Sequence, residues 1–217
     1  MLDREIGDKQ GIASILNNLG LLTYSQGDLS AARTLYEESL AIRREIGEKG
    51  GISNSLGNLG SVALALGDLA RARRYYEESF RLDREMDDKS GMAYGLHVLG
   101  MVGLAEGDAK AHEHLLQSLR LRQEIGEQFY QTSSLIGIAG LTLHEGNAPR
   151  AAQLLGAVES ALKALNVPME PEMIQFHTKT LATMREQLGE SAFQSAWEEG
   201  SQWSLEEAVK LALDEES

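Results

Sequence analysis

The strongest constraint on the fold of this chain is an internal repeat with a period of forty residues. The segment "YEESLAIRREIGEKGG" at 36–51 returns as "YEESFRLDREMDDKSG" at 76–91. An ungapped alignment of residues 7–46 with 47–86 gives 19 identical positions out of 40. Self-similarity at a fixed period of this size is typical of arrays in which helical units stack on their neighbours. The sequence therefore predicts an all-α fold.

The period divides the chain into a series of units. Leu-Gly pairs and Gly-Asp pairs hold the register in three copies, and a fourth copy is degenerate. The predicted units are a remnant of a preceding repeat helix at 1–6, repeats at 7–46, 47–86, 87–125 and 126–165, and C-terminal capping helices at 166–217.

Each copy has the pattern of two amphipathic helices. In the first copy Ile12, Leu16 and Leu19 recur at steps of three and four residues, which predicts one apolar helix face. Gly27 is expected to end this helix in the left-handed conformation, and Asp28 is placed to cap the next helix.

The repeated glycines predict close helix packing. Gly20 with Ala32, and Gly60 with Ala72, are expected where the two helices of one hairpin cross. Added bulk at such a crossing costs roughly 1 to 3 kcal/mol through strain. The substitution Gly60→Leu is therefore predicted to destabilise the array.

The pattern resembles the tetratricopeptide repeat in a variant of about forty residues. The resemblance covers about residues 7–165 and implies a right-handed α-α superhelix, in which the first helix of each pair lines a concave groove that binds a peptide or protein. The residues that carry it are Leu16, Leu19, Gly20, Gly27, Ala32, Tyr36, Ser39, Leu56, Leu59, Gly60, Gly67, Ala72, Tyr76 and Ser79. Copies three and four depart from it, with Leu115 and Leu155 in place of the tyrosine.

The first residues look like the end of a repeat. "LDREIGDKQG" matches "RLDREMDDKSG" of a later copy, so Leu2 to Ile6 are predicted to be the last turns of a second helix. An array that starts there exposes an apolar face, which favours a C-terminal piece of a longer protein and allows self-association through this N-terminal edge. The alternative is a short gene with a stub helix.

The period stops after Val167, and three more helices are predicted at about 170–188, 190–199 and 205–213. Ser204 and Glu207 have the spacing of a capping box for the last one. Phe193, Trp197 and Trp203 concentrate apolar surface, so this segment is expected to pack over the last repeat and close the array.

Residues 150–217 also resemble the tail of large bacterial regulators. The family implies a preceding signalling ATPase module, whose phosphate-binding loop is not found in these 217 residues. The residues that carry this resemblance are Leu188, Gly189, Ala192, Phe193, Ala196, Trp197, Gly200, Ser204, Glu207, Ala208, Ala212 and Leu213.

Composition excludes several classes of function. The chain has no cysteine, which removes disulfides and thiolate sites. A net charge of -13 opposes direct binding to nucleic acid or anionic lipid. No apolar run approaches the roughly 18 residues of a membrane span, so a cytoplasmic protein is expected.

No residues form a recognisable catalytic, metal or cofactor site. His112 and His114 are two residues apart and diverge on a helix, whereas a ligand pair needs a spacing of three or four. A basic cluster on one helix, interpreted as a solvated face with ion pairs, comprises Arg71, Arg73, Arg74, Arg81 and Arg84. No enzyme activity is predicted, because no acid, base or nucleophile stands at a useful spacing.

The predicted binding residues lie off the packing stripes of the first helices. They are Ser14, Asn17, Asn18, Leu21, Tyr24, Asn54, Asn58, Ser61, Tyr94, His97 and Met101, followed in the fourth copy by Ser133, Ile136 and Gly140. Asn18 and Asn58 precede the Leu-Gly pairs, where the resemblance implies contacts to a bound peptide backbone. The alternative is that both amides bond within the array.

The predicted function is therefore non-catalytic recognition of a protein or peptide, including another domain of the parent chain. The preferred hypothesis is the sensor or interaction segment of a larger bacterial signalling or transcriptional regulator. The alternative is a free-standing adaptor that joins other proteins.

Overall fold

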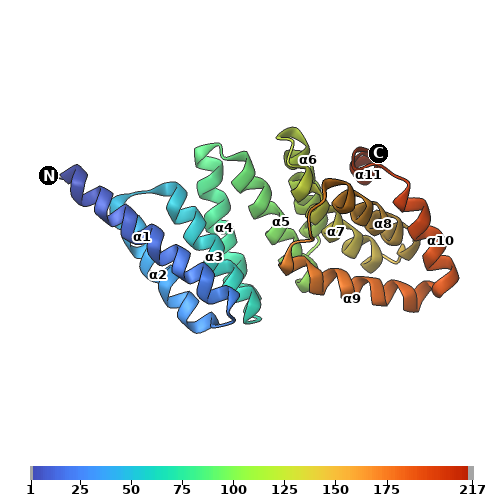
Figure 1. Ribbon diagram of the computed structural model, residues 1–217, viewed down its shortest axis with the longest axis horizontal. Coiled ribbons are helices and arrows are strands. Elements are labelled where there is room, and N and C mark those ends of the chain that lie inside the picture. Colours follow the sequence, from blue (N-terminus) through green and yellow to red (C-terminus); the bar gives the residue numbers. More distant parts are fainter. Residues whose placement is uncertain (1, 215–217) are drawn as a thin grey trace. The chain divides into compact units, whose positions relative to one another are not determined.

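The computed structural model describes residues 2–214, and within them the side chains of 8–170 and 173–214. This part of the chain folds into eleven α-helices (Figure 1). The helices are α1 Leu2–Ser25, α2 Leu29–Ile46, α3 Lys49–Ala65, α4 Leu69–Met86, α5 Lys89–Glu106, α6 Lys110–Glu124, α7 Gln128–His144, α8 Ala148–Leu165, α9 Pro171–Leu188, α10 Glu190–Ser201 and α11 Leu205–Asp214. The prediction of an all-α fold is confirmed.

The chain forms two compact units. Unit 1 is Met1–Val102 and unit 2 is Gly103–Ser217, with the division inside α5. Unit 1 contains α1 to α4 and most of α5, and unit 2 contains the end of α5 and α6 to α11. Among the described residues, no helix is both long enough and apolar enough to span a bilayer.

The ends of the helices follow the repeated sequence signals. Gly27 has φ of 85° before α2, and Gly47 has φ of 73° after it. Glycine adopts this left-handed region at no steric cost. The Asp28 side chain accepts a hydrogen bond from the Ala31 amide at 3.0 Å, and Asp68 does the same for Arg71 one repeat later. The predicted glycine stops and aspartate caps are therefore confirmed.

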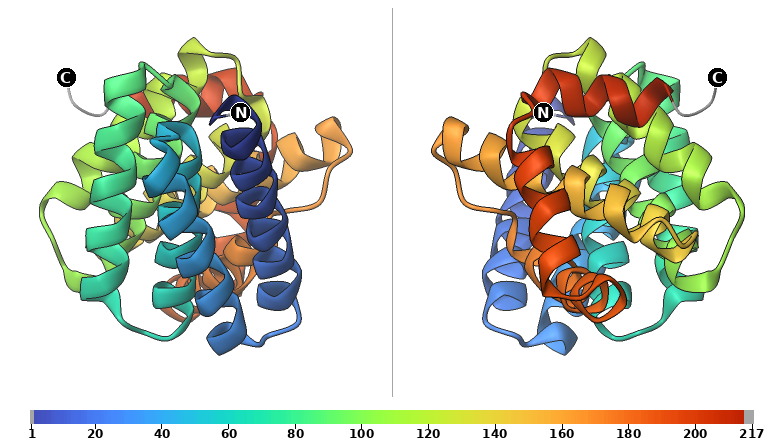
Figure 2. Two further views of the ribbon diagram at one scale, coloured as in Figure 1. Left: turned by 90° about the vertical axis from the view of Figure 1, so that its left-hand side faces the viewer. Right: turned by 90° about the vertical axis from the view of Figure 1, so that its right-hand side faces the viewer.

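The core of unit 1 repeats with the same period. Tyr36 and Leu40 of α2 pack against Leu56 and Leu59 of α3, and all four side chains are buried. One repeat later Tyr76 packs with Leu99 of α5. The left view of Figure 2 shows α1 and the following helices of unit 1 side by side.

The glycines at the predicted helix crossings face tyrosine rings. A Cβ atom on Gly60 would lie 2.5 Å from Cε1 of Tyr76, and one on Gly20 would lie 2.6 Å from Cε1 of Tyr36. The prediction of close packing holds, but the side chain that needs the space is tyrosine, not the expected Ala32 or Ala72. The reason is that the buried ring spans the gap between the two helices.

The N-terminal residues differ from the sequence expectation. Residues 2–6 were predicted to end a separate helix, with Gly7 in the position of Gly47. Instead α1 runs unbroken from Leu2 to Ser25.

In unit 2 the C-terminal helices cover the last repeat. Gly200 of α10 approaches Gln153 of α8 so closely that a Cβ atom there would overlap the Gln153 backbone. Phe193 of α10 is buried, and its ring lies 5.6 Å from that of Trp197. The right view of Figure 2 shows α10 and α11 on the outside of unit 2.

The last helix begins with the predicted capping box. The Ser204 amide donates to the Glu207 carboxylate at 2.8 Å, and the Glu207 amide donates to Ser204 Oγ at 3.2 Å. These bonds lower the pKa of Glu207, because they favour the ionised carboxylate. The three helices expected from sequence at the C-terminus are thus present.

Candidate binding surface

An amide cluster links the first helices α1 and α3. Asn58 Nδ2 donates to Asn17 Oδ1 at 2.9 Å and lies 3.5 Å from Asn54 Oδ1. Asn17 is nearly buried, Asn58 is half-buried and Asn54 is exposed. The position before the second Leu-Gly pair therefore has a bonding role within the array.

A hydroxyl and aromatic group continues this surface from α3 to α5. Ser61 Oγ lies 3.2 Å from the Tyr76 hydroxyl. The Tyr76 and Tyr94 rings meet edge to face, with centroids 6.4 Å apart. Tyr94 also lies over Gly57, where a Cβ atom would be 3.8 Å from its ring. We call Asn17, Asn54, Asn58, Ser61 and Tyr94 the polar strip.

The tyrosines beneath the strip stay neutral at physiological pH. Burial raises the pKa of Tyr36 to about 12, and the neighbouring Tyr24 adds to the rise. Burial also raises the pKa of Tyr76 well above its usual value, and Tyr94 acts in the same direction. The strip therefore offers uncharged hydroxyl and amide groups.

Three predicted residues of α1 lie apart from the strip. Asn18 and Leu21 are exposed, and Ser14 Oγ donates to the Gln10 carbonyl at 2.9 Å within the helix. Asn18 is the register equivalent of Asn58. Asn58 bonds to α1, whereas in the described part of unit 1 no other first helix lies on the matching side of α1 for Asn18 to reach. The structure thus separates the two asparagines that the sequence treats as a pair.

The remaining predicted residues of unit 1 have less exposed side chains. His97 is 6% exposed. Tyr24 packs against the α2–α3 core, and Met101 is half-buried. His97 was predicted to face a ligand, but its burial makes it part of the packing of α5.

The predicted surface does not continue openly onto α7. Ser133 donates a hydrogen bond to Glu170, and Ile136 is buried. Gly140 faces Phe176 of α9, whose ring a Cβ atom there would overlap. The C-terminal segment therefore covers the α7 residues that were expected to bind a partner.

Two residues of the surface were not found from sequence. Tyr76 was named only as a residue that carries the resemblance, yet its hydroxyl lies beside Ser61. Gly57 is the second residue, because its lack of a side chain leaves space for the Tyr94 ring. The equivalent position one repeat earlier is Asn17, which has a side chain. The glycine in a helical pattern was the available signal, since glycine in a helix interior is costly without a close neighbour.

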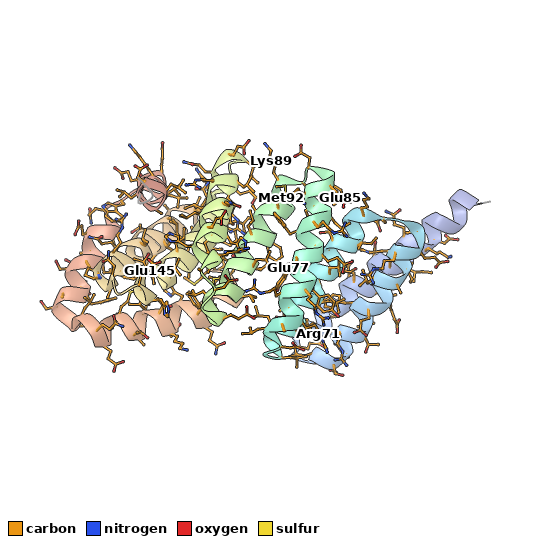
Figure 3. All side chains as sticks on the ribbon, turned by 180° about the vertical axis from the view of Figure 1, so that it is seen from behind. Arg71, Glu77, Glu85, Lys89, Met92 and Glu145 are labelled. Carbon is orange, nitrogen blue, oxygen red and sulfur yellow. The ribbon has the colours of Figure 1, made fainter. Side chains whose placement is uncertain are left out.

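The basic cluster on α4 is a face of ion pairs, as interpreted from sequence. Arg71 lies near the start of the helix and Glu85 near its end (Figure 3). Arg71 pairs with Asp68 at 3.3 Å and Arg81 with Glu85 at 2.6 Å. Glu85 also accepts from Lys49 of α3 at 2.9 Å, which lowers the pKa of its carboxyl.

A pocket of about 210 Å³ lies between α2, α3 and α4. Its floor is apolar, and Arg33, Asp68 and Arg71 stand at its edge. The pocket has room for little more than one aliphatic side chain. None of the predicted binding residues lines it.

The histidines do not build a metal centre in the part of the chain that the structure describes. No group of three histidine, aspartate or glutamate side chains is arranged to hold a metal ion there. His112 lies 3.7 Å from the Glu145 carboxylate.

Comparison with known proteins identifies the repeat. The family model described as tetratricopeptide repeat matches residues 11–85. Over this segment the chain is similar to tetratricopeptide repeats. The matched segment comprises all but the first turns of α1, together with α2, α3 and nearly all of α4. It carries four of the five residues of the polar strip.

Solved structures extend the likeness in fold to most of the chain. A candidate kinesin light chain from Podosopora anserina, with nearly identical TPR-like repeats, has a TM-score of 0.61 at 18% identity and covers 96% of this chain and 98% of its own. A substituted form of that protein gives the same score and identity, with 97% of its own chain covered. No curated protein sequence matches the chain. The shared property is the arrangement of TPR-like helix pairs, a fold that is typically non-catalytic.

Proposed function

We propose that unit 1 binds a protein or peptide partner through the polar strip on α1, α3 and α5. Tetratricopeptide repeats in general bind proteins and peptides, and the strip supplies the matching chemistry. Amide groups both donate and accept, which suits a peptide backbone regardless of its side chains. Tyr94 adds an exposed aromatic face with low conformational freedom, a type of side chain enriched at binding surfaces.

The single observation that supports this proposal is the continuity of the strip. A hydrogen bond joins Asn17 to Asn58, and a ring contact joins Tyr76 to Tyr94, so the strip is held in place by the buried Asn17 and Tyr76. A partner that binds a preorganised surface loses less entropy than one that must order it. The exposed amide of Asn54 and ring of Tyr94 are then the contact points.

We further propose that the chain acts in the cytoplasm as the sensor or interaction segment of a larger bacterial signalling or transcriptional regulator. Its support is the resemblance of residues 150–217 to the tails of such regulators. Partner binding would then act by stabilising one arrangement of the parent protein over another.

The test is selection of peptides from a displayed library of random 12-residue peptides on the full chain. We expect selected peptides to lose about tenfold in affinity for the Asn54→Ala/Tyr94→Ala variant, since these side chains make the direct contacts. Thr34→Ala, at an exposed site on α2, is the matched control and should bind as the unchanged chain does. Equal affinity of both variants for every selected peptide would reject the proposal.

Asn58 needs a separate variant because its amide holds the array together. Removal of its side chain leaves Asn17 Oδ1 without the donor at 2.9 Å. A buried acceptor that loses its partner costs about 1 to 3 kcal/mol. Asn58→Ala is therefore expected to lower stability, whereas Asn18→Ala at an exposed site should leave it unchanged.

A further inference from the structure

An apolar stripe runs along the exposed face of α1. Ile12, Ile15, Leu19 and Leu22 recur at steps of three and four residues, and we call them the α1 stripe. Their exposed fractions are 50%, 62%, 46% and 55%. Exposed apolar surface gathered on one helix face is a mark of an interaction site.

The repeat register shows how an equivalent surface is covered elsewhere in unit 1. Forty residues after Leu19 and Leu22 come Leu59 and Val62 of α3, each only 1% exposed. They are buried against Tyr36 and Leu40 of α2, the second helix of the preceding pair. The α1 stripe is therefore the same surface without a second helix upon it.

Gly11 gives an independent indication of what covers this face. The equivalent Gly51 makes room for Arg43, whose Nη1 would lie 2.6 Å from an added Cβ, and Gly91 makes the same room for Asp83. At Gly11 nothing lies within 4 Å of an added Cβ. Glycine inside a helix costs about 1 kcal/mol relative to alanine, so Gly11 fits a partner helix that brings a long polar side chain.

Ile15 indicates one way in which the partner differs from α2. Its equivalent on α3 is Ser55, whose Oγ lies 3.3 Å from Ser39 Oγ of α2. The larger isoleucine fills the space that this serine pair occupies. A helix that packs on the α1 stripe therefore needs a small apolar residue where α2 has Ser39.

We propose that the α1 stripe is a docking face for an amphipathic helix with the chemistry of α2. The partner helix carries an aromatic and aliphatic stripe like that of Tyr36 and Leu40, a small residue at the Ser39 position, and a long polar side chain over Gly11. It packs in the register in which α2 packs on α3.

A second copy of this chain does not supply such a helix. Within residues 8–170 the second-helix stripes are already covered, as shown by the buried Tyr36, Tyr76, Leu115 and Leu155. Between residues 8 and 170 this leaves the α1 stripe as the apolar helix face through which two copies could meet, and each copy carries a net charge of -13. The occupant is therefore a different helix.

The experiment is a fluorescence anisotropy titration of the full chain with a labelled synthetic peptide of residues 29–46 that carries Ser39→Ala. We expect saturable binding with a dissociation constant in the micromolar range. The variant Gly11→Leu should weaken binding at least about tenfold, because the added side chain occupies the space of the partner's polar group. Its thermal midpoint should not fall, since nothing lies near Gly11 in the free chain and leucine favours the helix more than glycine does.

A second pair of molecules tests the register. The unchanged chain should bind the Ser39→Ala peptide more tightly than the peptide that retains Ser39. The Ile15→Ser variant should show the opposite order of affinity. Isolated helices of this length are marginal in water, so the same peptide is also tethered in front of Met1 by a glycine-serine linker. The tethered form should raise the thermal midpoint by about 5 °C, and Gly11→Leu should abolish the rise.

Three results would each overturn the proposal. One is no binding of the free peptide together with no rise for the tethered form. Another is binding that Gly11→Leu does not weaken. The third is a dimer in sedimentation that Leu19→Glu dissociates, because the occupant would then be a second copy.

Discussion

At the scale of single residues, the array depends on glycines that face tyrosine rings. Gly60→Ala places a Cβ 2.5 Å from the Tyr76 ring, which is buried and cannot move aside. The strain of about 1 to 3 kcal/mol exceeds the helix propensity gained, up to about 1 kcal/mol. We expect a net loss of up to about 2 kcal/mol in urea unfolding followed by circular dichroism. Gly50→Ala, with open space around its Cβ, is the matched control and should not destabilise; a Gly60→Ala chain as stable as this control would contradict the packing.

A buried carboxylate on α4 predicts a dependence of stability on pH. Asp83 is buried and accepts a hydrogen bond from Ser53, and burial raises its pKa above 3.8. Between that unfolded value and the raised folded value, the folded state binds more protons, so stability falls as pH rises through this window. Above the window the charged carboxylate remains a cost.

Replacement of Asp83 by asparagine should remove this cost. The free energy of unfolding of Asp83→Asn is expected to exceed that of the unchanged chain at pH 7, with the difference shrinking towards pH 4. Urea unfolding at both pH values measures it, and Glu38→Gln at an exposed site is the control. A loss of stability at pH 7 would mean that the ionised carboxylate stabilises the fold.

At the scale of helices, the packing of α10 on α8 is the closest in unit 2. Gly200 meets the Gln153 backbone, and Gly156 meets the backbone of Trp197. Backbone atoms cannot move aside as a side chain can, so Gly200→Ala should cost about 3 kcal/mol or more. Trp197 fluorescence during urea unfolding measures this loss. Ser195→Ala on the exposed side of α10 should leave the midpoint unchanged, and a Gly200→Ala midpoint equal to that control would contradict the contact.

The contacts between helices also explain why the sequence predicted most helices but not which side chains are exposed. Helix ends follow from local chemistry, such as the left-handed Gly27 and the Asp28 cap, and these signals repeat with the period. The environment of a side chain depends on neighbouring helices. Asn18 and Asn58 are equivalent in register, yet only Asn58 has another first helix, α1, within reach of its amide.

Errors of prediction also lie at the two ends of the array. Gly7 resembles the left-handed Gly47 in sequence, but α1 continues through it. The α7 residues Ser133 and Gly140 fit the pattern of an open face, but α9 and the residues before it cover them. The repeat pattern cannot predict that these residues are covered, because the covering segment follows the last repeat and does not share the pattern.

At the scale of the whole molecule, the division into two compact units makes it possible to compare how a substitution in one unit affects the stability of each unit. Both tryptophans, Trp197 and Trp203, belong to unit 2, whereas circular dichroism reports helices of both units. In helical repeat arrays, stability is approximately a sum of intrinsic repeat terms and contacts between neighbours. Gly60→Ala should therefore lower the urea midpoint measured by circular dichroism more than the midpoint measured by tryptophan fluorescence. Gly200→Ala should shift the fluorescence midpoint more, and equal shifts by both probes for both variants would show that the chain unfolds as one cooperative unit.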